Sequence, residues 1–276
     1  MKTSNNDFFG DSGYRLDVDE QKIQEVTNSM PHTLETEDDI KQVLSFLAEH
    51  YRRYKRLYRG HASAAYTISS TIARFTSQDI VVAERIGYDY FREHVFQDSW
   101  LKHKLDNTDE RLFVMSIGRH LGLPCRLIDV TASLETAVWF AVMNPQYCDK
   151  DGEVILFLLD TYNPQVIQPA SPFDEIPTGK IAYAHEAFLG NGLDELPLGE
   201  QRRFVQNGHF LWVGDDDLMQ EQSTIEKALP VMRFKIPASA KLNLAKALFR
   251  DVYSGCAYRS QIEKINSLIL KHIKSR

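Results

Sequence analysis

The sequence predicts an α+β fold with a small mixed or antiparallel sheet at its core and helices packed around it. Segments whose apolar residues recur at helical spacing gather in the first half of the 276-residue chain, and apolar runs typical of strands gather in the second half. The two kinds of segment do not alternate as a parallel βαβ sheet would require. We therefore expect one main domain, residues 35–276, preceded by a polar and partly ordered leader, residues 1–34.

The first predicted helix begins after Thr36, which is a candidate N-cap with Asp39 three residues on, a variant of the capping box. Gly122 and Pro124 end a later helix, and Thr131 or Ser133 begins the next. The predicted helices cover about residues 36–54, 79–104, 109–121, 133–143, 239–252 and 259–274. The predicted strands or extended segments cover about residues 57–60, 125–130, 153–159, 180–184, 201–213 and 231–236.

Composition and charge exclude several classes of protein. The formal net charge is −6, which argues against bulk, salt-driven binding of nucleic acid. The three cysteines form no CxxC pair, so neither a zinc site nor a disulfide framework is indicated, and reduced thiols are expected. The first residues lack the apolar core of a signal peptide, and no apolar run is long enough to span a bilayer. We therefore expect a cytoplasmic protein without a membrane partner.

The first polar segment that could take part in binding or catalysis is Tyr58-Arg59-Gly60, followed by Arg74. An arginine in a short apolar strand must be paired if it is buried, and its planar fork suits a carboxylate or a phosphate. Gly60 allows close approach of a backbone or a ligand. A structural ion pair, with Asp129 as a possible partner, is the alternative.

The second segment, residues 119–131, gathers His120, Arg126, Asp129 and Thr131 among apolar residues. A helix that begins at Ser133 places free N–H groups next to Thr131, which is a ready anion site. A helix cap plus a buried Arg–Asp pair is the alternative. Cys125 lies in the same segment without a clear general base beside it.

The third segment contains Gln206, Gly208, His209 and Phe210, and its Asn-Gly step favours a turn or bulge. A hairpin turn with polar residues facing solvent is the alternative. No dinucleotide-binding, P-loop, zinc-protease or calcium-loop motif is present, and nothing in the sequence indicates a metal site.

Taken in order, the three segments resemble the FRG domain family, whose first motif is Phe-Arg-Gly. Here that motif is Tyr58-Arg59-Gly60, and the second and third family motifs are similar to residues 119–131 and 203–210. The resemblance covers about residues 35–250. The second motif departs from the family pattern at three positions, where Arg119 replaces Gln, Cys125 replaces Thr and Val130 replaces Trp.

The motif order of this family is similar to that of ADP-ribosyltransferases, which implies an ADP-ribosyltransferase-like fold with NAD as substrate. The resemblance implies that Arg59 holds the phosphate or ribose of NAD, that Thr131 supports the nicotinamide ribose, and that Arg126 and Asp129 brace the site. Gln206 falls where an acid is expected, and a neutral amide does not stabilise developing positive charge as a carboxylate does. It can still contact a ribose hydroxyl. The candidate catalytic residues are Arg59, Gln206 and Asp129, and the candidate ligand-binding residues are Tyr58, Gly60, His120, Arg126, Thr131, Gly208 and Phe210.

Two classes of function follow from this resemblance. The first is an NAD-dependent ADP-ribosyl-transferring or NAD-cleaving effector of bacterial toxin or defence type, with a protein or nucleic acid as acceptor. The second is a non-catalytic module that senses a nucleotide or another phosphate-bearing small molecule. A nuclease or RNA-binding role for the basic run at residues 52–56 is weaker, because the chain is acidic overall and helix-terminal cations explain that run.

Overall fold

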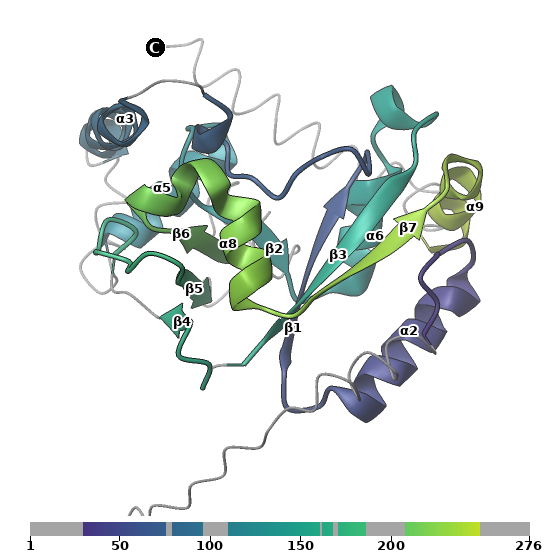
Figure 1. Ribbon diagram of the computed structural model, residues 1–276. Coiled ribbons are helices and arrows are strands. Elements are labelled where there is room, and N and C mark those ends of the chain that lie inside the picture. Colours follow the sequence, from purple (N-terminus) through teal and green to yellow (C-terminus); the bar gives the residue numbers. More distant parts are fainter. Residues whose placement is uncertain are drawn as a thin grey trace, which may run out of the picture.

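The computed structural model describes residues 30–75, 79–95, 110–160, 162–167, 171–185 and 208–248. Within these residues the chain forms one sheet of seven strands and six α-helices (Figure 1). The strands are β1 (Lys55–His61), β2 (Ile128–Thr131), β3 (Gly152–Leu159), β4 (Val166–Ile167), β5 (Ile181–His185), β6 (Gly208–Val213) and β7 (Val231–Ile236). The α-helices are α2 (Glu37–His50), α3 (Ile80–Val95), α5 (Glu110–Leu121), α6 (Leu134–Val142), α8 (Glu221–Ala228) and α9 (Ala238–Leu248).

The sheet has the strand order β4-β5-β6-β2-β1-β3-β7. Only β4 and β5 run parallel to each other, and every other neighbouring pair is antiparallel. The predicted α+β class with a mixed sheet is therefore confirmed. β3 is buried along its whole length because it lies between β1 and β7 and is covered on both faces, which accounts for its continuous apolar sequence.

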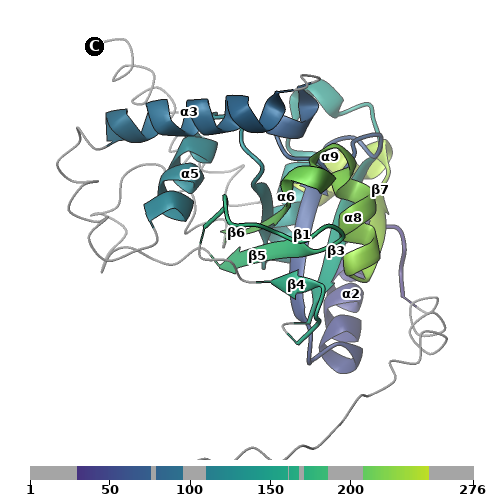
Figure 2. The same cartoon turned by 60° about the vertical axis from the view of Figure 1, so that its left-hand side comes forward.

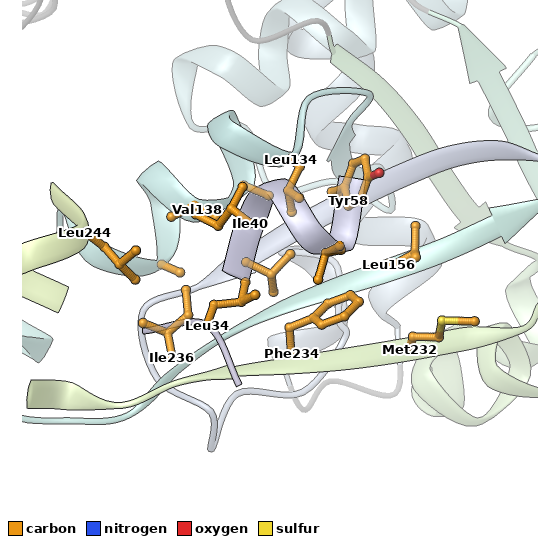
Figure 3. Close-up of a cluster of buried hydrophobic side chains, with 14 of the residues drawn as sticks. Leu34, Ile40, Tyr58, Leu134, Val138, Leu156, Met232, Phe234, Ile236 and Leu244 are labelled. Carbon is orange, nitrogen blue, oxygen red and sulfur yellow. The ribbon is translucent and has the colours of Figure 1, made fainter. Parts of the chain in front are cut away.

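Side chains alternate between the two faces of each strand, and each face has its own hydrophobic core. On one face, α2, α6 and α9 cover β1, β3 and β7 around a cluster that includes Tyr58, Leu156 and Phe234 (Figure 3). On the other face, Leu57 and Phe157 pack with Ile225 of α8. A third cluster joins α3 and α5 to the β5–β6 side of the sheet, and Figure 2 shows these two helices together at one side of the molecule.

The ladder between β1 and β2 is much shorter than its neighbours. β1 pairs with β3 over all seven residues, from Lys55 with Leu159 to His61 with Glu153. By contrast, the register between β1 and β2 contains a single pair, Tyr58 with Thr131. The sheet therefore separates between β1 and β2 beyond Tyr58, at the position of Arg59.

Most predicted elements are confirmed with small shifts at their ends. The capping box at the start of α2 is present, since Thr36 Oγ1 accepts from the Asp39 N–H at 3.2 Å and Asp39 Oδ2 accepts from the Thr36 N–H at 2.8 Å. The end of the expected leader packs on the body, because Met30 and Leu34 are buried and Thr33 bridges to Lys235. The helix predicted at residues 259–274 lies outside the described residues.

Two features differ from the sequence prediction. The segment from the 3-10 helix η4 (Asp215–Gln220) through α8 was not predicted, because only Ile225 gives α8 a large apolar anchor. Helical spacing predicts Ile80, Ile86 and Tyr90 on the buried face of α3, and of these three Ile80 alone is buried. Ile86 and Tyr90 are 64% and 67% exposed, and Glu84 is buried instead because Arg126 pairs with it.

Candidate functional site

The side chain of Arg59 bridges β1 and β2 where the backbone pairing between these strands stops. The alternation along β1 places its side chain on the same face as Leu57, toward α8. Its Nε–H donates to His61 Nε2 at 3.0 Å, and its Nη1–H donates to the backbone oxygen of Asp129 at 2.6 Å. Both acceptors are neutral. Within the described residues, Nη2 of Arg59 makes no hydrogen bond and no carboxylate lies within 4 Å of this guanidinium.

The ring of His61 is held in one tautomer by its two neighbours. Because a guanidinium can only donate, Nε2 must be the acceptor from Arg59, and Nδ1–H therefore donates to Glu153 Oε1 at 3.0 Å. Burial lowers the pKa of His61, so the ring stays neutral at pH 7. Arg233 then binds both oxygens of Glu153 at 2.9 Å and Glu226 of α8 at 2.7 Å. A continuous hydrogen-bond network thus runs from Arg59 through His61, Glu153 and Arg233 to Glu226, and it holds the Arg59 side chain in place.

Charged groups of both signs surround Arg59. Burial is the main cause that lowers the pKa of Arg59 to about 10; the charges of Asp129 and Glu221 oppose that shift, and those of Arg119 and Arg74 add to it. Glu221 is 3% exposed, and burial raises its pKa to about 7. Counted with Arg59 itself, three guanidinium groups lie near two carboxyl groups, one of which is partly protonated near pH 7, so the cluster as a whole carries a net positive charge. An anion would be stabilised here.

Arg126 has a different environment from Arg59, because the carboxylates of Glu84 and Asp215 neutralise its charge. It is 1% exposed, and its Nε–H and backbone N–H both donate to Glu84 of α3, at 2.7 and 2.6 Å. Nη2 lies 2.5 Å from Glu84 Oε2, and Nη1 donates to Asp215 at 2.7 Å. Burial alone would lower the pKa of Arg126, but the two carboxylates raise it above its ordinary value. Arg126 therefore ties α3, the start of β2 and η4 together.

Asp129 does not form the ion pair with Arg59 that was the alternative to a ligand site. Its carboxylate accepts from Nη2 of Arg119 at 2.5 Å, and only its backbone oxygen bonds Arg59. Arg119, at which the chain departs from the family pattern, thus fixes this half-exposed carboxylate from α5. Asp129 braces the segment that Arg59 contacts.

Tyr58 and Gly60 lie on the opposite face of β1 from Arg59. Tyr58 is 2% exposed within the core under α6. A Cβ on Gly60 would lie 1.8 Å from the backbone oxygen of Ala137, so the glycine permits α6 to pack against β1. Of the two readings of Gly60, close approach of a backbone is the one the structure supports.

The remaining predicted residues of the second and third segments divide into capping and core positions. Thr131 Oγ1 accepts from the Ser133 N–H at 3.1 Å, and Ser133 Oγ accepts from the Thr136 N–H at 3.1 Å, so side chains cap the start of α6. Gly208 pairs with Thr131 across β2 and β6, and Phe210 is a buried core residue. These positions assemble the sheet beside Arg59.

Of the predicted site residues, Gln206 and the side chain of His120 lie outside the described residues. Cys125 is fully buried, and burial raises the pKa of its thiol to about 12, which disfavours the reactive thiolate. Within the described ranges, no group of three or more His, Cys, Asp or Glu side chains is arranged to hold a metal ion. No helix among them is long and apolar enough to cross a membrane.

Sequence reasoning missed two residues that act on Arg59. His61 follows Arg59 by two positions on the same strand, so the period of two could have placed both on one face. Glu221 could not be found that way, because it lies in the helix that was not predicted.

The fold and the site define a mixed α+β domain in which an incompletely paired arginine lies at a separation in the sheet. Residues 54–150 match the FRG domain. This chain therefore contains an FRG domain, and the matched range holds both Tyr58-Arg59-Gly60 and the segment from Arg119 to Thr131. Comparison with curated proteins and with solved structures gave no match.

Proposed function

We propose that this protein binds a phosphate-bearing nucleotide at Arg59, that the nucleotide is NAD, and that the domain transfers its ADP-ribosyl group or cleaves it. The observation that carries the proposal is the pairing of Arg59. Two of its nitrogens bond neutral acceptors while Nη2 has no partner within the described residues. A guanidinium fixed in this way has its positive charge available for an oxyanion.

Transfer of the ADP-ribosyl group breaks one bond and forms another. The bond between the nicotinamide nitrogen and ribose C1′ breaks, and its electron pair leaves on nicotinamide. A nucleophile of the acceptor, or water, forms the new bond to C1′ and loses its proton. Arg59 holds a phosphate oxygen, and the network through His61 and Glu153 keeps the guanidinium oriented. Orientation of this kind contributes to rate because the reacting groups need not be ordered during the reaction.

The test uses NAD labelled in its adenosine part, incubated with cell extract, together with a measurement of released nicotinamide. Arg59→Met should reduce label transfer or nicotinamide release by about 10- to 100-fold, as expected for the loss of a charge-assisted hydrogen bond. Arg53→Ala is the matched control, because Arg53 is an exposed arginine that bonds only Tyr54 within the described residues. Absence of both transfer and nicotinamide release in the wild type would exclude the enzymatic proposal.

A non-catalytic nucleotide-sensing module is the second candidate, and a specific observation favours it. Several motif residues have structural partners, among them Arg126 with Glu84 and Asp129 with Arg119. The third motif has Gln206 where an acid is expected. Tight binding of NAD or ADP-ribose that depends on Arg59, without release of nicotinamide, would identify this function.

For the enzymatic candidate, the biological setting we propose is an effector of toxin or defence type with a protein or nucleic acid as acceptor.

A further inference from the structure

A groove of about 660 Å³ lies between the segment that follows β1 and the segment from η4 to α8. Its walls are rich in uncharged polar side chains: Thr67, Ser69, Gln220, Gln222 and Ser223. Three exposed charged side chains, Arg74, Glu226 and Lys227, also line it. Such a lining offers many hydrogen bonds and charges of both signs.

Glu221 in the wall of this groove is incompletely satisfied. Its Oε2 accepts from the Ser70 N–H at 2.6 Å. Its Oε1 is buried and has no hydrogen-bond partner among the described residues. A buried carboxyl oxygen without a partner is costly, so this position favours a ligand group that can donate a hydrogen bond.

The groove is electrostatically continuous with the Arg59 site. Two of its lining residues, Arg74 and Glu221, are among the four groups whose charges act on the Arg59 guanidinium. Glu226, which also lines the groove, ends the hydrogen-bond network that runs from Arg59 through His61 and Glu153. The groove and the Arg59 site therefore share the charges of Arg74 and Glu221.

We propose that the groove binds the sugar phosphate part of the ligand, with Glu221 accepting a hydrogen bond from a ribose hydroxyl and Arg74 contacting the phosphate. This assignment rests on the proposed phosphate site at Arg59, but it adds a sugar subsite outside the three sequence motifs. A bare phosphate would leave Glu221 unused.

The experiment measures binding by isothermal titration of two probes, ribose 5-phosphate and inorganic phosphate, which differ only in the sugar. The wild type should bind ribose 5-phosphate more tightly than phosphate. Glu221→Gln keeps an acceptor for Ser70 and should weaken ribose 5-phosphate binding about tenfold while leaving phosphate binding unchanged. Arg74→Ala should weaken both probes. The matched control is Glu49→Gln, because Glu49 is exposed on α2, and α2 covers the opposite face of the sheet.

A pH titration separates ligand contact from a general structural effect. Glu221 faces Ser70, Arg59 of β1 and Glu84 of α3, and the groove adds Arg74, Glu226 and Lys227. The affinity difference between wild type and Glu221→Gln should grow as pH rises through about 7, where this carboxyl ionises. The titration of the probe itself cancels in that difference.

Equal affinity of wild type and Glu221→Gln for ribose 5-phosphate, or no preference of the wild type for the sugar probe, would overturn the sugar subsite. Neither result touches the NAD assay with Arg59→Met. Conversely, a sugar preference that depends on Glu221 supports the groove even where the wild type fails to act on NAD. The two proposals can therefore fail separately.

Discussion

Replacing Arg126 with methionine should destabilise the protein severely, whereas the same change at Arg59 should not. Removal of the Arg126 guanidinium leaves Glu84, which is 2% exposed, as a buried charge without its cation. Breaking a buried pair in this way costs about 3–5 kcal/mol. At roughly 2–4 °C per kcal/mol for a chain of this size class, the melting temperature should fall by roughly 6–20 °C.

Arg59→Met removes hydrogen bonds to two neutral acceptors and leaves no carboxylate within 4 Å unpaired among the described residues. The acceptor on buried His61 loses its donor, at a cost of about 1–3 kcal/mol. Burial already disfavours the charged form of Arg59, as its lowered pKa shows, so loss of that charge offsets part of the cost. We therefore expect a smaller fall in melting temperature than for Arg126→Met.

Thermal unfolding of both variants, followed by circular dichroism, measures this contrast. The double variant Arg126→Met, Glu84→Gln should recover part of the loss, because the amide oxygen still accepts from the backbone N–H of Arg126 without a buried charge. If Arg126→Met melts within 2 °C of the wild type, or if Arg59→Met is the more damaging change, the division of the two arginines into structural and ligand-binding roles is wrong.

Three further outcomes follow from local geometry. Gly60→Ala should prevent folding or cost at least about 3 kcal/mol, as its Cβ would overlap the Ala137 carbonyl oxygen, and expression with a melting curve checks this. Thr36→Ala should cost about 1 kcal/mol through loss of the capping box with Asp39, and a stability equal to that of the wild type would contradict the cap. Glu221 has a pKa of about 7 when folded against an ordinary value of 4.5, so its protonated form stabilises the fold at low pH and that contribution is lost as pH rises from about 4.5 to 7. The stability of Glu221→Gln relative to wild type should therefore increase by roughly 3 kcal/mol across that range, which denaturant unfolding at several pH values measures.

Local sequence signals predicted those elements whose causes are local. The capping box of α2 and the apolar run of β3 depend on neighbours in the chain, and both were found. The failure at α3 has a tertiary cause. Its apolar residues Ile86 and Tyr90 face outward because Glu84 must face Arg126, more than forty positions away. Helix α8 was not predicted because its buried face carries Glu221 and Thr224 at positions where an amphipathic helix usually has apolar side chains.

In the candidate site, too, the residue types can be read from the sequence, but their tertiary partners cannot. Arg59 lies in β1 and Arg126 just before β2, and sequence alone gives each the same two interpretations, ion pair or ligand contact. Their roles separate only when the partners are known: Glu84 and Asp215 neutralise Arg126, while His61 and a backbone oxygen orient Arg59 without neutralising it. Burial keeps His61 neutral, although its bond to Glu153 opposes that effect, and protonation of the ring would remove the acceptor from Arg59. Ligand binding should therefore weaken at pH values below the lowered pKa of His61, and in His61→Gln, whose side-chain oxygen can replace Nε2 as acceptor, that acid sensitivity should be reduced. An acid limb unchanged in His61→Gln would show that Arg59 does not depend on this ring for its orientation.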